Sequence, residues 1–149
     1  MEYDSEGLAR AREAAEDSNF PGRHAGCAIH AMNDEGKERW FVATNQIACC
    51  EASDLDKQFG VHDMEKPYDW TPHAEIAAIV GAASSNVNLF GATAYLAGSP
   101  CLPCSIAMAH AGIDLVVIAN DDAFKKTEWG IKEGLAYLQD YGVNVVREA

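Results

Sequence analysis

The sequence predicts an α/β protein built as a three-layer α/β/α sandwich around a five-stranded mixed sheet. Two strand-like runs, 25–31 and 40–44, flank an Asn-Asp-Glu-Gly segment at 33–36, which is typical of a β-hairpin. From residue 72 onward, helical and strand-like segments alternate along the chain. A hairpin followed by such alternation is typical of helices packed on both faces of one sheet.

The hydrophobic pattern places the other elements in order. Residues 4–17 are expected to form an amphipathic helix with Leu8, Ala11 and Ala15 on its inner stripe. The later pattern predicts helices at 72–83, 101–111 and 127–141 and strands at 92–97, 115–119 and 143–146. Because a helix separates the last two strands, we expect them to pair in parallel. We find no internal repeat and expect a single domain over residues 1–149.

The charge of the chain bears on its partners. It has 11 basic and 23 acidic residues, for a net charge of -12, and the basic residues form no stripe along the sequence. A protein that binds nucleic acid must place lysines and arginines against many phosphates. A polynucleotide partner is therefore disfavoured, whereas a local basic pocket for one phosphate stays possible, and the simplest reading of the acidity is solubility.

The lack of a targeting signal and the number of cysteines indicate where in the cell the protein is expected. The first twenty residues lack the apolar segment of a secretory signal, and the longest apolar run, 76–83, is too short to span a membrane. We therefore expect a cytoplasmic protein that makes no membrane contact. An odd number of cysteines in such a chain indicates thiols or metal ligands rather than disulfides. The five are Cys27, Cys49, Cys50, Cys101 and Cys104.

Two short motifs carry the chemistry, Thr-Pro-His-Ala-Glu at 71–75 and Ser-Pro-Cys-Leu-Pro-Cys at 99–104. Each stands where a helix is expected to begin. In both, the first residue is a suitable N-cap, and the proline after it suits the first helical position, where its missing N–H costs nothing. Two helix N-termini would therefore present His73, Cys101 and Cys104.

This set of side chains suits zinc. The positive end of a helix dipole stabilises thiolates, the form of cysteine that binds metal. One imidazole and two thiolates leave the fourth tetrahedral position for water, as in catalytic rather than structural zinc sites. Two thiolates also neutralise Zn²⁺, so a nearby carboxylate can accept a proton from that water. Glu75, two residues after His73, is placed to do so.

The motifs have three other interpretations. Cys-x-Pro-Cys also matches thioredoxin-like redox motifs, but these expect a later proline, and none follows Pro103. A redox role also leaves His73 and Glu75 unexplained. A purely structural zinc site is the second alternative, and a catalytically inactive zinc domain that serves as an interaction module is the third. The intact Glu75 argues against the third.

The segment HAE followed by PCLPC resembles the H-x-E…P-C-x-x-C signature of the cytidine and deoxycytidylate deaminase superfamily. The resemblance covers about residues 25–146, and PHAEIAAI, GATAYLAGSPCLPC and CSIAMAHAGIDLVVI look most like deoxycytidylate deaminases. It implies a Zn²⁺ cofactor held by His73, Cys101 and Cys104, with Glu75 as the proton shuttle. The family fold is the sandwich predicted above.

The same resemblance implies the substrate contacts. The backbone N–H of Ala74 would hold the base carbonyl, the backbone carbonyl of Ser99 the exocyclic amine, and Asn45 the sugar. The alternative interpretation of Asn45 is a turn residue at the end of a strand. Deoxycytidylate deaminases usually follow that asparagine with glycine and soon a proline, whereas Gln-Ile-Ala follows here at 46–48. The family's phosphate contacts in that loop, and its regulation by nucleoside triphosphates, therefore do not transfer.

The implied reaction is hydrolysis of an exocyclic amine with release of ammonia. The resemblance favours dCMP as the substrate and dUMP as the product, with a guanine, cytosine or cytidine deaminase as the alternative. Since family members commonly form oligomers, we also expect a homo-oligomer.

Two further assignments concern a second metal and a phosphate. A second zinc site would draw on Cys49, Cys50, His62 and His24. A nucleotide phosphate would require local positive charge, either from a neighbouring subunit or from this chain. The candidate donors in this chain are Lys125, Lys126, Arg23, Lys57 and Lys66.

Overall fold

The structure, a computed structural model, describes residues 3–18, 24–46, 71–120 and 130–149. Its centre is a five-stranded sheet in the order β2-β1-β3-β4-β5. The strands are β1 (Gly26–Met32), β2 (Glu38–Thr44), β3 (Thr93–Leu96), β4 (Leu115–Ile118) and β5 (Asn144–Arg147). β1 pairs antiparallel with β2 and β3, whereas β4 pairs in parallel with β3 and β5. The predicted mixed sheet and the parallel pairing of its last two strands are confirmed.

The predicted hairpin joins β1 and β2. Its turn is held by the side chain of Asn33, whose Oδ1 accepts hydrogen bonds from the backbone N–H groups of Glu35 and Lys37 at 3.0 and 2.8 Å. Gly36 has φ +77°, a conformation that glycine adopts without steric cost. Asparagine and glycine thus supply the turn chemistry that the sequence indicated.

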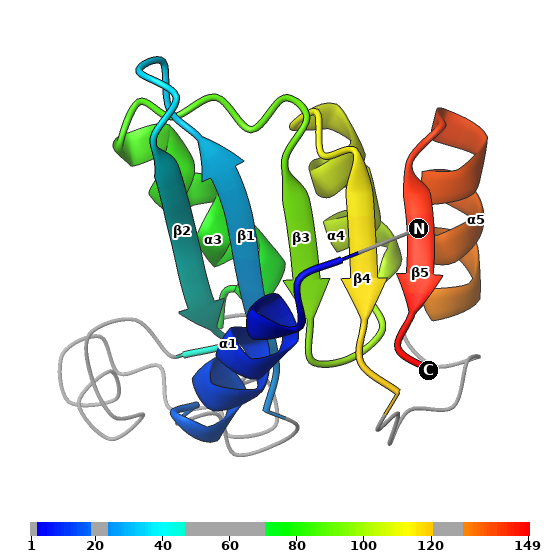
Figure 1. The fold of residues 1–149 in the computed structure, drawn as a ribbon. Helices are drawn as coiled ribbons and strands as arrows, with labels where there is room; N and C mark the ends of the chain where they lie inside the picture. The colour runs from blue at the N-terminus through cyan, green and yellow to red at the C-terminus, as the bar shows by residue number, and fades with distance from the viewer. Residues whose placement is uncertain (1–2, 19–23, 47–70, 121–129) are drawn as a thin grey trace, which may run out of the picture.

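Helices cover both faces of the sheet (Figure 1). Helix α1 (Ser5–Glu16) lies on one face, and the opposite face carries α3 (Ala74–Ser84), α4 (Leu102–His110) and α5 (Ile131–Tyr141). The start of α1 is capped by Asp4, whose Oδ1 accepts from the N–H of Glu6. Three layers result, as predicted. No helix in the described part of the chain is long and apolar enough to cross a membrane.

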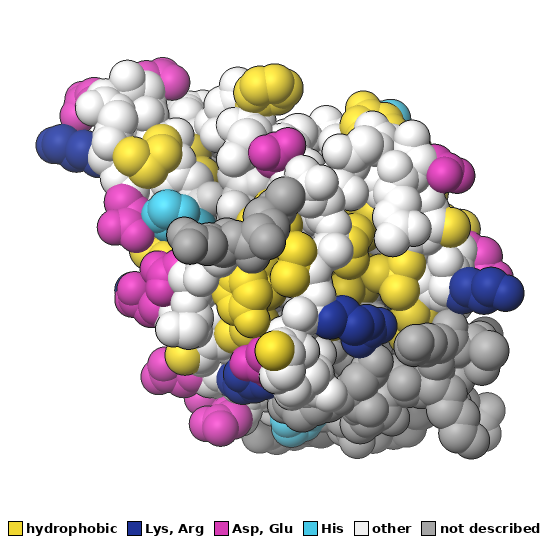
Figure 2. Space-filling view, turned by 45° about the vertical axis from the view of Figure 1, so that its right-hand side comes forward, with side chains coloured by type: hydrophobic (Ala, Val, Ile, Leu, Met, Phe, Trp, Pro, Cys, Tyr) yellow, Lys and Arg dark blue, Asp and Glu magenta, His cyan; other side chains and the backbone are white. Residues whose placement is uncertain are grey.

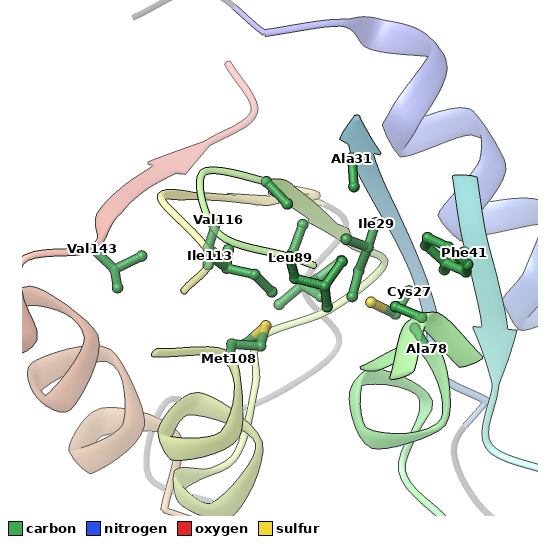
Figure 3. Close-up of a cluster of buried hydrophobic side chains, with 14 of the residues drawn as sticks. Cys27, Ile29, Ala31, Phe41, Ala78, Leu89, Met108, Ile113, Val116 and Val143 are labelled. Atoms are coloured by element: carbon green, nitrogen blue, oxygen red, sulfur yellow. The ribbon is translucent and has the colours of Figure 1, made fainter. Parts of the chain in front are cut away.

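Among the described residues, two hydrophobic clusters hold these layers together. The larger one lies between the sheet and α3, α4 and α5, and Figure 3 shows Cys27, Ile29, Ala78 and Met108 meeting there. The smaller one lies under α1, where Leu8 and Ala11 are buried as predicted. Ala14 is buried in place of the expected Ala15, because the contact follows the three-residue spacing from Ala11.

The starts of α3 and α4 differ from the prediction. The expected N-caps, Thr71 and Ser99, do not cap: the N-cap positions belong to His73 and Cys101, two residues further on. Neither side chain makes a capping hydrogen bond within the described structure. An N-cap residue has an extended backbone, which turns its side chain off the end of the helix, and here it turns the two side chains toward each other. As predicted, His73, Cys101 and Cys104 lie at the starts of two helices. Pro103 lies in the first turn of α4.

Candidate metal centre

The candidate metal centre lies at the carboxyl end of β3, where α3 and α4 begin. His73 immediately precedes α3, Cys101 immediately precedes α4, and Cys104 is the third residue of α4. Since Leu96 ends β3, only a short connection separates that strand from Cys101. The carboxyl ends of strands are where open α/β sheets bind their ligands.

The three side chains converge closely. Nδ1 of His73 lies 3.2 Å from Sγ of Cys104 and 3.3 Å from Sγ of Cys101, and the ligand atoms all lie within 4.8 Å of one another. Zinc bonds of about 2.3 Å to sulfur and about 2.0 Å to nitrogen require tetrahedral ligand atoms roughly 3.5 Å apart. The two nitrogen–sulfur distances are therefore within a few tenths of an ångström of those in a zinc site, and the donor set suits this metal. It offers three ligands, which leaves a fourth position of the tetrahedron to a water or a substrate.

The two cysteines have opposite proton affinities in the metal-free protein. A hydrogen bond from the Cys104 thiol, helped by His73, lowers the pKa of Cys101 to about 4. The same hydrogen bond, together with burial, raises the pKa of Cys104. The hydrogen bond to Cys101 also raises the pKa of His73. The pair thus holds one proton between two sulfurs, and metal binding would displace it.

Glu75 lies beside this cluster as the second residue of α3. Its side chain is only 6% exposed, and burial raises the pKa of its carboxyl group, against the opposing effect of hydrogen bonds from the Cys104 side chain and its own backbone N–H. A buried carboxyl that is neither a metal ligand nor permanently ionised is suited to carry protons. Cys27 lies buried nearby, and burial, then the Glu75 charge, raise the pKa of its thiol.

The proposed substrate-contact residues lie at the same edge of the sheet. Ala74 is the first residue of α3, and an N–H in the first turn of a helix has no intrahelical acceptor. Ser99 precedes Cys101 by two residues and is 6% exposed. Asn45 follows β2, and its Oδ1 accepts hydrogen bonds from Ser18 Oγ and from the N–H of Ala25, both at 2.8 Å. Asn45 therefore has a structural role at the strand end, as its alternative interpretation expected.

Helix α5 presses against the segment that carries Cys101. A Cβ atom on Gly134 would lie 2.6 Å from Oγ of Ser105 and 3.0 Å from the carbonyl oxygen of Cys101. That carbonyl in turn accepts the N–H of Ser105 at 3.0 Å. The absence of a side chain at Gly134 is what lets α5 pack here, so the position of a metal ligand depends on this contact.

Several predicted residues fall outside the described part of the chain. They are Cys49, Cys50 and His62 of the second zinc site and all five candidate phosphate donors, Lys125, Lys126, Arg23, Lys57 and Lys66. Among the described residues, one group of three or more potential metal ligands occurs, and His24 is not part of it.

Sequence reasoning did not single out one basic residue, Arg147. Its Nη2 donates to Oγ of Ser99 at 3.2 Å. The alternation of side chains along β5 places Arg147 on the same face as Val145. It does not indicate Ser99 as a neighbour, because the two residues are 48 positions apart in the chain.

An α/β/α sandwich that presents one imidazole and two thiolates from two helix starts, with a carboxyl group beside them, is the architecture of a zinc-dependent hydrolytic deaminase. The chain matches the family model of the cytidine and deoxycytidylate deaminase zinc-binding region over residues 1–120, and it belongs to this family. No curated protein sequence matches the chain.

Solved structures share the fold. The dCMP deaminase of cyanophage S-TIM5 in its apo form has a TM-score of 0.69 at 23% identity, covering 97% of this chain and 95% of that one. A structure from a study of tRNA:A34 deaminases has a TM-score of 0.52 at 21% identity, covering 97% and 95%. The guanine deaminase of Nitrosomonas europaea has a TM-score of 0.52 at 18% identity, covering 96% and 73%. These likenesses confirm the cytidine deaminase-like fold.

Proposed function

We propose that the protein converts dCMP to dUMP with release of ammonia. The observation that carries the hydrolytic part is the cluster of His73, Cys101 and Cys104 with Glu75 beside it. The choice of a cytosine nucleotide is supported by the sequence motifs and by the cyanophage S-TIM5 enzyme, whose structure in complex with dCMP and dUMP has a TM-score of 0.66 with this chain.

In this proposal, His73, Cys101 and Cys104 hold the zinc ion, which when bound makes a water molecule acidic enough to react near neutral pH. Glu75 takes a proton from the attacking water and passes it to the ring nitrogen of the base. The Glu75 carboxylate then takes the proton of the hydroxyl group newly bonded to the ring carbon and gives it to the departing amine, so that ammonia leaves as the C–N bond breaks and the new C–O bond becomes a carbonyl. The raised pKa of Glu75 supports this role, because such a group can both accept and return a proton.

The base would be oriented by backbone groups. The N–H of Ala74, at the first position of α3, would donate to the base carbonyl, and the carbonyl of Ser99 would accept from the exocyclic amine. Asn45 would meet the sugar. Each group lies at the carboxyl edge of the sheet or at the helix starts beside it, which supports one common binding site.

A single nucleotide, rather than a polynucleotide, is the substrate in this proposal. The chain has a net charge of -12. On the described part of the face in Figure 2, lysine and arginine side chains are scattered singly among acidic ones and form no stripe. Such a surface repels a polyanion but does not prevent a local contact with one phosphate.

An assay of ammonia release over a panel of substrates tests the proposal. The panel contains dCMP, deoxycytidine, cytidine, cytosine and guanine, each with the zinc-loaded protein. We expect kcat/KM for dCMP to exceed that for deoxycytidine by orders of magnitude. If deoxycytidine, cytosine or guanine is turned over as well as dCMP, the protein is instead a nucleoside or nucleobase deaminase.

A further inference from the structure

The candidate metal ligands differ in how far they are open to solvent. His73 is exposed, Cys101 is half-buried, and Cys104 is fully buried, with 0% of its surface exposed. Cys101 stands just before α4, whereas Cys104 lies within the first turn of that helix. A small reagent that enters the site from solvent therefore meets the sulfur of Cys101 before that of Cys104.

The two sulfurs are already in contact. The ligand atoms of the site lie within 4.8 Å of one another, and the Cys104 thiol donates a hydrogen bond to the Cys101 sulfur. Residues three apart on a helix have Cβ atoms about 5–6 Å apart, and a disulfide requires about 3.5–4.5 Å. A small shift at the start of α4 is therefore enough to join them. Two cysteines separated by two residues are also the arrangement of thiol–disulfide oxidoreductases.

Zinc and a disulfide exclude each other at this site. Zinc binds thiolates, and a sulfur bonded to a second sulfur no longer carries the charge that binds the metal. In the opposite direction, a zinc ion about 2.3 Å from both sulfurs occupies the electron pairs that attack an oxidant. The state of the two cysteines thus decides whether the site can hold its metal.

We propose that Cys101 and Cys104 form an oxidative modification site, at which hydrogen peroxide converts the two ligands to a disulfide and so prevents zinc binding. Cys101 is the residue that peroxide attacks, and Cys104 is the residue that closes the bond. The inference rests on the zinc site of the proposed function and not on the choice of dCMP as the substrate. Reversible loss of the metal then switches the enzyme off.

The chemistry has two steps. The Cys101 sulfur attacks one oxygen of hydrogen peroxide, the O–O bond breaks, and the other oxygen leaves as water with the thiol proton, so that Cys101 becomes a sulfenic acid. The Cys104 sulfur then attacks the Cys101 sulfur, the S–O bond breaks, and a second water leaves with the Cys104 proton. The two sulfurs have given two electrons to the peroxide, and a dithiol such as dithiothreitol returns them.

The first test treats zinc-loaded and metal-free protein with hydrogen peroxide. The metal-free protein should lose two of its five thiols and the mass of two hydrogen atoms, and it should bind no zinc until dithiothreitol is added. The zinc-loaded protein should react several-fold more slowly and release its metal in step with the loss of thiols. Mass spectrometry of proteolytic fragments should place the bond between Cys101 and Cys104. Zinc release is measured on the holoenzyme, so this readout does not depend on the stability of the metal-free protein.

Substitutions test the order in which the sulfurs react. Cys104→Ser leaves Cys101 without its partner, so peroxide should produce a sulfenic acid that dimedone traps at Cys101. Cys101→Ser leaves only the buried sulfur, which should react several-fold more slowly. Cys27→Ala is the matched control: Cys27 is fully buried and outside the ligand group, so this variant should form the disulfide at the wild-type rate. Replacing both Cys49 and Cys50 by serine should also leave the disulfide intact.

The inference fails if the metal-free protein keeps both sulfurs reduced at a peroxide concentration that oxidises free glutathione. It also fails if the disulfide involves another cysteine, if bound zinc gives no protection, or if Cys101→Ser is oxidised as fast as Cys104→Ser. These results leave the proposed function standing, because that function is tested by ammonia release from dCMP. A protein that forms the disulfide and loses its zinc but deaminates no substrate of the panel would refute the proposed function alone.

Discussion

Substitutions should distinguish the two cysteine ligands from Cys27, the other cysteine in the described part of the chain. Cys101→Ser and Cys104→Ser should each lose most of the bound zinc, since hydroxyl groups are poor replacements for thiolates, and each should also lower the melting temperature. Cys27→Ala is the control: Cys27 is fully buried but outside the ligand group, so this variant should keep its zinc at some cost in stability. Elemental analysis after dialysis against a chelator measures the metal. Full zinc content in both serine variants would refute the assignment.

Glu75→Gln should separate metal binding from proton transfer. The amide keeps the size of the side chain but cannot take up the proton, so kcat should fall by about 10²–10⁴-fold or more. The zinc content should stay at the wild-type level, because the carboxyl group is not among the three grouped ligands. Ammonia release and elemental analysis on the same preparation give both values. Retained activity would require a different proton carrier.

The burial of Glu75 should also appear in the pH dependence of stability. Because burial raises the pKa of its carboxyl group, the folded protein holds that proton more tightly than the unfolded chain does. The free energy of unfolding must then fall as the pH rises from the ordinary glutamate pKa of about 4.3 through the raised value. The Glu75→Gln variant has no carboxyl proton at this position to release. Its free energy of unfolding relative to that of the wild type should therefore increase over the same pH interval. Urea denaturation of metal-free protein at a series of pH values measures the difference, and parallel curves would contradict it.

At the scale of elements, the contact between α4 and α5 should be sensitive to one methyl group. Gly134→Ala places its Cβ against Ser105 and the Cys101 carbonyl, and such overpacking typically costs about 1–3 kcal/mol. Zinc affinity should fall as well, because Cys101 must move. Gly81→Ala in α3 is the matched control: the nearest atom to its Cβ is 3.9 Å away, so the gain in helix propensity should stabilise the protein by about 0.5–1 kcal/mol.

A second substitution, Ser105→Ala, tests whether contact with the Ser105 side chain causes the loss of stability in Gly134→Ala. The Ser105 hydroxyl is buried and has no hydrogen-bond partner among the described residues, so Ser105→Ala alone should cost little. In the double variant, Ser105→Ala should relieve part of the loss caused by Gly134→Ala. Denaturant unfolding of the four proteins yields the coupling energy, and strict additivity would show that the two side chains do not compete for space.

The elements themselves were largely predictable from local sequence. Asn33 and Gly36 mark the hairpin turn, and the apolar run of β4, buried on both faces, is typical of a central parallel strand. The N-caps of α3 and α4 were predicted two residues early, because the capping preference of Thr71 and Ser99 is outweighed by the geometry that joins His73 to Cys101. Local preferences are worth about 1 kcal/mol, which such contacts easily exceed.

The residues of the candidate site also divide into those that the local sequence predicts and those that it does not. His73, Glu75, Cys101 and Cys104 lie in two short motifs, so their types and spacing were readable from the chain. The approach of Arg147 to Ser99 and of Gly134 to Cys101 depends on how β5 and α5 pack against distant segments. Such contacts follow from the tertiary arrangement, and no local pattern in the sequence encodes them.

At the scale of the whole molecule, the charge balance favours the small substrate proposed above over a polynucleotide. A deaminase that edits a polynucleotide must bind many phosphates, and its affinity then falls steeply with added salt. Here 23 acidic residues oppose 11 basic ones, so a chain of phosphates meets net repulsion wherever it extends beyond the site. We therefore expect kcat/KM for a cytosine within a short single-stranded oligodeoxynucleotide to be far below that for dCMP. Added salt should raise the oligonucleotide rate slightly by screening the repulsion.

Deamination of the oligonucleotide can be followed by mass spectrometry, with free dCMP as the internal reference at each salt concentration. The matched comparison is a dinucleotide with the same cytosine, which carries the local phosphate but little of the extended charge. It should react faster than the longer strand, since repulsion grows with the number of phosphates outside the site. An oligonucleotide that matches dCMP and loses its rate steeply with added salt would instead reveal a basic nucleic-acid path on the protein.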